Sequence, residues 1–279
     1  MFASRGLLRS SRRLVGGISS ATRTYVNLSK PSTSVAVLEL DRAPVNSLSK
    51  EMADAVSAAI KEAEGDDKVQ ALVLKSSNPK IFSAGLDITE MNNPEVERLE
   101  DFWRSIQDLF LTLYGSRLST VAAIEGHSPA GGCLLAMSCD YRVMTEGENF
   151  KIGLNETKLG IAAPYWLKDL FVKTIGNREA ELGLGLGKLY SPSEALSVNL
   201  IDEVVKNEDV LEVAMKEAET WAKIPPKGRV ASKVMLRSEM MDELREKKEL
   251  DVGWFRDFIM EEGTQKGIDA YLKSLGGKK

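Results

Sequence analysis

Glu156 is a lone carboxylic acid between apolar residues in the segment 152–161, which reads Ile-Gly-Leu-Asn-Glu-Thr-Lys-Leu-Gly-Ile. Burial in such a setting raises the pKa of a carboxyl group toward neutral pH, where the group serves best as a base. A glutamate in a solvated loop would fit the same letters, and residues 155–157 also match a glycosylation sequon. On its own, the segment predicts only a candidate base.

Two glycine-bearing segments could donate hydrogen bonds to a negative charge. Residues 81–87 read Ile-Phe-Ser-Ala-Gly-Leu-Asp, and residues 126–134 read Gly-His-Ser-Pro-Ala-Gly-Gly-Cys-Leu. Tight turns and helix N-termini leave backbone amides without partners, and such amides suit a developing oxyanion. Small residues also serve ordinary turns and close helix packing, so neither segment decides the matter alone.

Other residues with chemical potential give weaker signals. His127 is the only histidine, and its place in the second segment favours a role in loop packing over nucleophilic catalysis. Cys133 and Cys139 lack metal-ligand spacing, so we expect no metal site. Residues 183–188 suggest a phosphate-binding loop, but Leu189 stands where Ser or Thr is required.

Hydrophobic periodicity predicts the elements that position these segments. Short apolar runs predict strands at 35–40, 69–75, 120–124 and 141–144. Helical spacing predicts helices at 49–64, 94–114, 130–138, 165–174, 178–186, 192–198 and 209–222, with further helix to the C-terminus. Strands that alternate with helices indicate β-α crossovers and a largely parallel sheet, so the predicted fold class is α/β.

The first thirty residues differ in composition from the rest of the chain. They hold six basic residues and many serines, and no acidic residue precedes Glu39, which predicts a mitochondrial transit peptide at 1–30. A disordered basic tail is the alternative. The whole chain has 37 basic and 41 acidic residues, so loss of the leader leaves an acidic surface that repels nucleic acid. No apolar run reaches the roughly 18 residues of a membrane span.

Taken together and in this order, the three segments resemble the crotonase superfamily, from Val35 to the C-terminus. The resemblance implies a core of ββα spiral turns at 31–205 and a C-terminal helical region at 206–279 that builds homotrimers. It also implies that the backbone amides of Leu86 and Gly131 form the oxyanion hole for a thioester. The substrate-binding residues carried over from the family's motifs are Ala84, Gly85, Leu86, Asp87, Ile88, Gly131 and Asn155.

The acid-base residues indicate which reaction of the superfamily to expect. Hydratases that resemble this chain carry two glutamates, but Leu134 occupies the position of the first, so that Glu156 alone remains. Hydration needs one group to activate water and another to deliver a proton, whereas one carboxylate can run a 1,3-proton shift. Residues 153–169 also look like those of the enoyl-CoA isomerases in this superfamily, and Leu134, Leu154 and Ile161 are expected to exclude water.

The resemblance therefore implies an isomerase that converts 3-enoyl-CoA to 2-trans-enoyl-CoA in the mitochondrial matrix, during β-oxidation of unsaturated fatty acids. It implies no cofactor, since coenzyme A is part of the substrate. Hydration or thioester hydrolysis is the alternative within the superfamily. An RNA-binding homologue is the alternative of another class, but the acidic surface and the lack of a basic stripe with aromatic residues argue against it.

Overall fold

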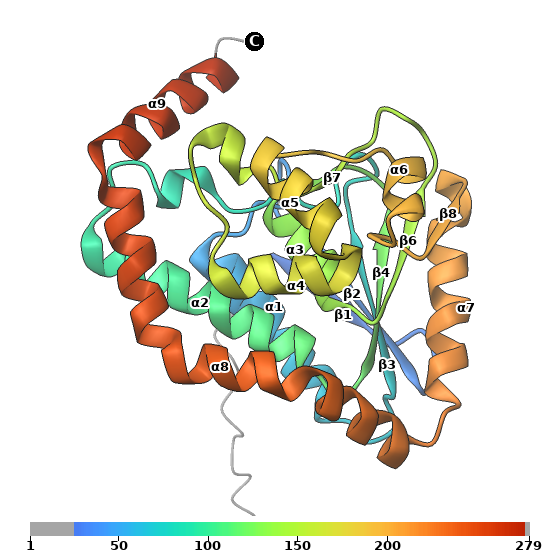
Figure 1. Ribbon diagram of the computed structural model, residues 1–279. Coiled ribbons are helices and arrows are strands. Elements are labelled where there is room, and N and C mark those ends of the chain that lie inside the picture. Colours follow the sequence, from blue (N-terminus) through green and yellow to red (C-terminus); the bar gives the residue numbers. More distant parts are fainter. Residues whose placement is uncertain (1–24, 277–279) are drawn as a thin grey trace, which may run out of the picture.

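A six-stranded sheet lies at the centre of the computed structural model, which describes residues 25–276 (Figure 1). Its strands run in the order β1-β2-β3-β4-β6-β8, with β1 antiparallel to β2 and all other neighbours parallel. The strands are β1 (Val26–Ser29), β2 (Val35–Leu40), β3 (Ala71–Ser76), β4 (Ser119–Ile124), β6 (Tyr141–Thr145) and β8 (Glu203–Val205). Two short strands, β5 (Ser128–Pro129) and β7 (Ile152–Gly153), pair separately in parallel.

Helices connect and cover the strands. They are α1 (Lys50–Glu64), α2 (Val96–Tyr114), α3 (Gly131–Ser138), α4 (Tyr165–Ile175), α5 (Asn177–Leu186), α6 (Pro192–Ser197), α7 (Val210–Ala222), α8 (Pro226–Met260) and α9 (Glu262–Gly276), with 3-10 turns η2 (Ile88–Glu90), η3 (Glu156–Leu159) and η4 (Asn207–Asp209). The predicted start of α1 is confirmed, because the Ser49 side chain accepts a hydrogen bond from the Met52 amide. No described helix is long and apolar enough to cross a membrane.

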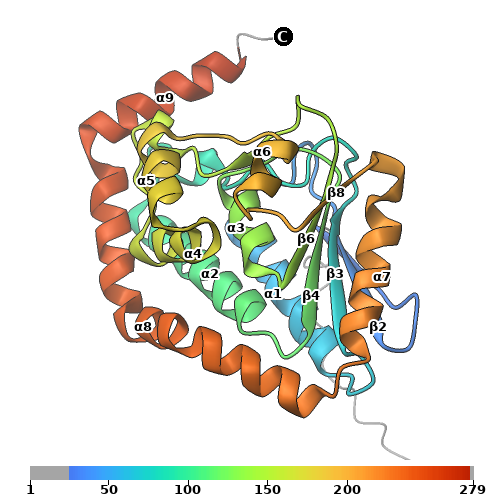
Figure 2. The ribbon, with the colours of Figure 1, turned by 45° about the vertical axis from the view of Figure 1, so that its right-hand side comes forward.

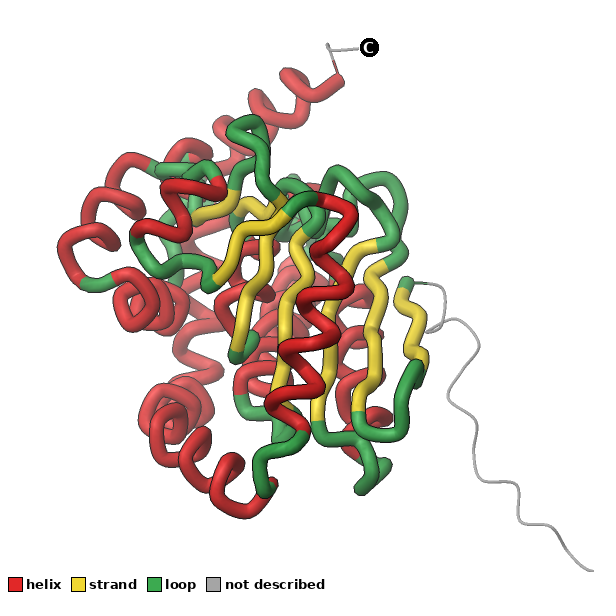
Figure 3. Tube along the Cα trace, turned by 90° about the vertical axis from the view of Figure 1, so that its right-hand side faces the viewer, coloured by secondary structure: helices red, strands yellow, loops and turns green. Residues whose placement is uncertain are grey.

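The two faces of the sheet have different covers (Figures 2 and 3). Alternate side chains of a strand point to opposite faces, so Val35 and Val37 of β2 face α7 while Leu38 and Leu40 face the larger core under α1 and α2. In Figure 3, α7 crosses the near face of the sheet. The parallel strands, buried on both faces, confirm the predicted α/β class.

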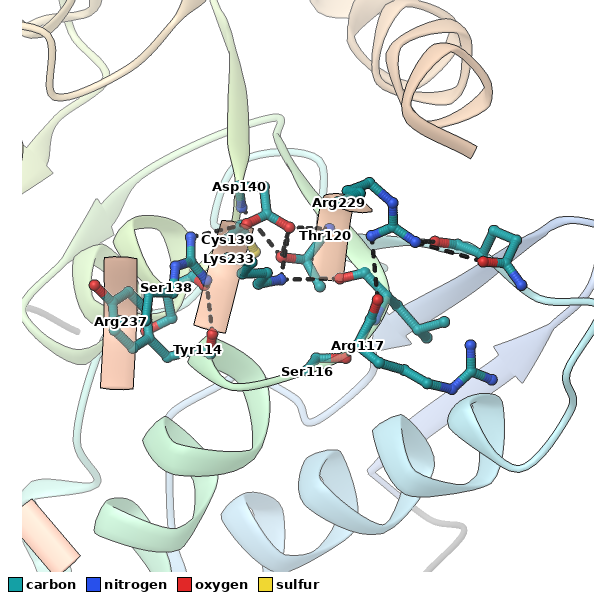
Figure 4. A network of polar contacts seen from close by, with 12 residues as sticks. Tyr114, Ser116, Arg117, Thr120, Ser138, Cys139, Asp140, Arg229, Lys233 and Arg237 are labelled. Atoms are coloured by element: carbon teal, nitrogen blue, oxygen red, sulfur yellow. Dashed lines mark hydrogen bonds and ion pairs between the residues drawn. The ribbon is translucent and has the colours of Figure 1, made fainter. Parts of the chain in front are cut away.

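The first half of α8 is joined to the core by basic side chains one turn apart. Lys233 and Arg237 meet the two oxygens of the buried Asp140 carboxylate at 2.7 and 2.8 Å (Figure 4). Lys233 also donates to the Leu118 carbonyl oxygen, and Arg229 donates to the Arg117 carbonyl oxygen. These contacts fix the helix against the ends of the sheet strands, so that its second half can extend across α2 and α4.

The predicted leader at 1–30 and the predicted C-terminal region at 206–279 each contain an element that belongs with the sheet. Residues 1–24 of the predicted leader lie outside the described residues, but Val26–Ser29 forms β1 and pairs with β2. This strand was not predicted, because the basic composition of the residues around it is typical of a leader. Within the predicted region 206–279, α7 covers the sheet, whereas α8 and α9 extend away from it.

Candidate active site

Glu156 begins η3, directly after β7 and the half-buried Asn155. Its side chain lines an apolar pocket, and Gly160, with a φ of 72°, ends the turn in the left-handed region. Burial raises the pKa of Glu156 to about 7, although a hydrogen bond from its own backbone amide opposes the shift. A carboxyl group with this pKa can both accept and return a proton near neutral pH.

The turn at Gly85 presents the backbone amide of Leu86. Gly85 has a φ of 92°, and a Cβ atom there would lie 2.9 Å from the Gly131 nitrogen, so both the backbone conformation and the space require glycine. Leu48 holds the turn on its other side, because its amide donates to the Gly85 carbonyl oxygen and its own carbonyl oxygen accepts from the Asp87 amide. The turn is therefore fixed from two directions.

The second amide belongs to Gly131, at the first position of α3. Ala130 caps this helix with a φ of 50°, an uncommon conformation for a residue with a side chain that costs about 1–3 kcal/mol. A Cβ atom on Gly131 would lie 3.1 Å from the Leu86 nitrogen, so the two amides are close neighbours. Within residues 25–276, neither amide has a hydrogen-bond acceptor, and both are available to a ligand.

One backbone contact links this amide pair to the strand before Glu156. The Ala130 amide donates to the carbonyl oxygen of Gly153 in β7 at 2.8 Å. The short β5–β7 pair therefore sets the distance between the second loop and the glutamate. The candidate base and the Gly131 amide are therefore positioned by one hydrogen-bonded unit.

The pocket joins the three predicted site residues. Leu86, Gly131 and Glu156 all line it, together with Trp103, Ile106, Leu134, Ile161, Ala162, Pro164, Trp166, Leu167 and Phe255. Nearly all of these side chains are apolar, which favours a fatty acyl chain over a polar ligand. Leu134 and Ile161 lie in the lining as expected, whereas Leu154 is buried but does not contribute to it.

The remaining predicted substrate-binding residues lie around the first loop. Ala84 and Gly85 form the turn, and Ile88 begins η2. The Asp87 carboxylate points to neighbours within the protein, pairing with Arg42 at 2.7 Å and accepting hydrogen bonds from Thr89. Burial raises the pKa of Asp87, but these hydrogen bonds outweigh it and hold the pKa below its usual value. The side chain of Asp87 thus stabilises the loop.

Trp103, Trp166 and Phe255 form an aromatic wall of the pocket, which sequence reasoning missed. Trp103 and Phe255 lie in segments that the sequence predicted only as helix, and their ring planes stack with centroids 3.7 Å apart. Trp166 lies beside Trp103 and Phe110. These residues come from α2, α4 and α8, and no local pattern reveals that three distant segments meet at one pocket.

His127 has the predicted packing role. Its backbone pairs with Ile81, its ring meets Phe150 edge-on at 5.4 Å, and it does not line the pocket. Burial and the nearby charge of Lys151 lower its pKa. In the described part of the chain, no three His, Cys, Asp or Glu side chains gather as a metal site would require.

Comparisons with known proteins show which family the chain resembles in sequence and fold. The family model Enoyl-CoA hydratase/isomerase matches residues 30–276. The mouse protein (Mus musculus) named Enoyl-CoA delta isomerase 1, mitochondrial is 44% identical over 88% of this chain and 85% of its own length, and the human protein of that name is 42% identical over 88% and 81%. The crystal structure of human mitochondrial delta3-delta2-enoyl-CoA isomerase superimposes with a TM-score of 0.89 at 40% identity, covering 91% of this chain and 99% of that one.

Proposed function

The chain belongs to the enoyl-CoA hydratase/isomerase family, and we propose that it is an enoyl-CoA isomerase whose single catalytic base is Glu156. One observation carries the proposal: the Glu156 side chain shares an apolar pocket with two neighbouring backbone amides that have no acceptor in the described part of the chain. Such a pocket offers a base for a weakly acidic carbon and a place for the negative charge that results.

The proposed reaction begins with the thioester oxygen of a 3-enoyl-CoA between the Leu86 and Gly131 amides. The Glu156 carboxylate removes a proton from C2, and the electrons of that C–H bond move toward the thioester oxygen to give a dienolate. The two amides stabilise this charge by about 3 kcal/mol each. The Glu156 carboxylic acid then returns the proton to C4 as the C2–C3 double bond forms, so that charge and atoms balance without a cofactor.

Leu134 distinguishes this reaction from hydration. It is buried and lines the pocket where hydratases of the family carry a second glutamate, so no second group is in place to activate water. Ile161 adds to the apolar lining and protects the dienolate from solvent. The backbone around residues 84–88 and 131, together with Asn155, is proposed to bind the thioester end of the substrate.

The names of the relatives place them in mitochondria, and we propose that this chain acts in the mitochondrial matrix as a homotrimer. Exposed apolar side chains on α8, including Met235 and Leu236, support a subunit contact at that helix. Cleavage at Lys30 would remove β1, so we expect the mature chain to begin before Val26. N-terminal sequencing of the protein from mitochondria would check this boundary.

The test of the catalytic proposal is Glu156→Gln, which keeps the size of the side chain but removes the base. We expect turnover of 3-enoyl-CoA to fall by roughly 10² or more, while a saturated acyl-CoA still binds. Conjugation of the double bond with the thioester is followed by ultraviolet absorbance. Glu148→Gln, at an exposed glutamate, is the matched control.

Two results would contradict the proposal. Turnover of Glu156→Gln within tenfold of the wild-type value would exclude Glu156 as the base. A 3-hydroxyacyl-CoA as the main product of the wild-type protein would identify a hydratase. Both outcomes are resolved by chromatography of the products.

A further inference from the structure

Asp251 of α8 carries a buried carboxyl group outside the catalytic constellation. One of its oxygens accepts three hydrogen bonds, from Trp103 Nε1 at 2.8 Å, Gln107 Nε2 at 2.7 Å and Trp166 Nε1 at 3.1 Å. Only 4% of Asp251 is exposed. A buried carboxyl group is costly unless its hydrogen bonds are satisfied, so its presence here reflects the three donors that converge on it.

The two indole rings that donate to Asp251 both line the pocket that contains Glu156. Asp251 itself is not part of the lining, so the N–H edges of both rings point away from the pocket and toward α8. Phe255, one turn further along α8, stacks on Trp103 and also lines the pocket. Asp251 thus holds the N–H edges of both indoles, and Phe255 holds the ring face of Trp103.

The wall leaves little free space. The cavity between the lining side chains is about 20 Å³, which is room for little more than one water molecule. An acyl chain therefore enters only as lining side chains move, and a longer chain requires more of the lining, including the aromatic wall, to move. The displacement has to break hydrogen bonds to a buried carboxyl group, so it becomes harder as the acyl chain grows longer.

We infer that Asp251 is a positioning residue that limits acyl chain length, because it locks the indoles of Trp103 and Trp166 across the acyl pocket. The inference rests on the proposed isomerase function and adds a determinant of its substrate class. Short 3-enoyl thioesters require the least displacement of the locked wall, and longer ones require more. The anchor comes from α8, whereas the base and the amide donors come from the core.

The test is Asp251→Asn, which keeps the shape of the side chain. The asparagine oxygen can still accept, but its NH2 group only donates, so the side chain has one acceptor oxygen instead of two and holds the three converging N–H groups less firmly than the carboxyl group does. We expect kcat/KM for a 12-carbon 3-enoyl-CoA to rise relative to that for a 6-carbon substrate by roughly tenfold, the selectivity that a small change in an apolar pocket brings. This ratio does not depend on the fraction of protein that is folded.

Asp140→Asn is the control for lost stability. It weakens a buried ion cluster on the first half of α8 and does not touch the pocket, so the chain-length ratio should stay at the wild-type value. Glu249→Gln, at an exposed glutamate close to Asp251 in sequence, controls for a change on the same helix. An unchanged ratio in Asp251→Asn, or an equal change in Asp140→Asn, would overturn the inference.

Calorimetric binding of saturated 6-carbon and 12-carbon acyl-CoA separates this inference from the proposed function. Wild-type protein that binds neither thioester and turns over no 3-enoyl-CoA would refute the proposed function. If the wild-type protein isomerises 3-enoyl-CoA and Asp251→Asn keeps the wild-type ratio of the two dissociation constants, only the role of Asp251 is refuted. If Asp251→Asn fails to fold, Trp166→Phe removes one of the same donors and should shift both ratios in the same direction.

Discussion

Glu156→Gln should change the pH dependence of stability as well as catalysis. The pKa of Glu156 is raised from 4.5 to about 7 in the folded protein, so between these values the folded state binds more protons than the unfolded state. The free energy of unfolding therefore falls as pH rises through this window. With about 1.4 kcal/mol for each pKa unit, the fall due to Glu156 is about 2.5 kcal/mol between pH 5 and pH 8.

The variant removes this titration, so its free energy of unfolding should gain about 2.5 kcal/mol relative to wild type when the pH is raised from 5 to 8. Urea unfolding followed by tryptophan fluorescence, at one protein concentration and both pH values, measures the difference. Other titrating groups cancel in this comparison, and Glu148→Gln should show no such gain. If the free energies of unfolding of wild type and Glu156→Gln differ by the same amount at pH 5 and at pH 8, the raised pKa of Glu156 is refuted.

Four further predictions follow from the same geometry. Initial isomerisation rates should rise about tenfold from pH 6 to pH 8, because Glu156 must be ionised to accept the proton. A rate that falls over this range would exclude an ionised Glu156 as the base. Gly131→Ala should lower kcat by about 10²–10³, because its Cβ atom crowds the neighbouring amide donor, while calorimetry still detects acyl-CoA binding. Leu134→Glu should introduce hydration of 2-enoyl-CoA, seen as 3-hydroxyacyl-CoA by chromatography, and its absence would show that another difference decides the reaction. Asp140→Ala should destabilise the protein by about 3–5 kcal/mol in urea unfolding, because it leaves Lys233 buried without its counter-charge.

The regular elements could be predicted because their patterns are local. The predicted helix at 94–114 is observed as α2 (Val96–Tyr114), whose buried side chains repeat at helical spacing. The predicted strand at 35–40 is β2, with the same bounds. In α2 the period of apolar residues states which face is buried, whereas β2 is a nearly continuous apolar run that is buried on both faces.

Elements whose stability depends on distant partners were missed. β5 and β7 have two residues each and exist only because they pair with each other across the two loops of the site. β8 is a short edge strand whose residues are only half-buried, so no apolar run marks it. Their positions follow from tertiary pairing, which a pattern along the chain does not contain.

The family resemblance predicted more of the site than physical reasoning did. Residue types alone left Glu156 as one candidate base and did not decide whether the two loops form an oxyanion site or ordinary turns. The resemblance predicted the family and an enoyl-CoA isomerase, and the comparisons agree with both. The roles of Leu86, Gly131 and Glu156 stay predictions, supported by their meeting in one pocket. Asp251 gave no signal, since it lies in a helix rich in charged residues.

The features that suit the site to catalysis oppose the stability of the fold. The positive φ of Ala130 and the desolvated carboxyl group of the half-buried Glu156 both raise the free energy of the folded state, and so do the two amides, which have no acceptor among residues 25–276. These costs persist only where the surroundings hold the backbone firmly. Here the β5–β7 pair fixes one loop, the Arg42–Asp87 ion pair fixes the other, and α8 closes the pocket from behind. Rigid contacts around the pocket thus allow a base and an oxyanion site to stay in place before substrate arrives, which is the condition for electrostatic catalysis.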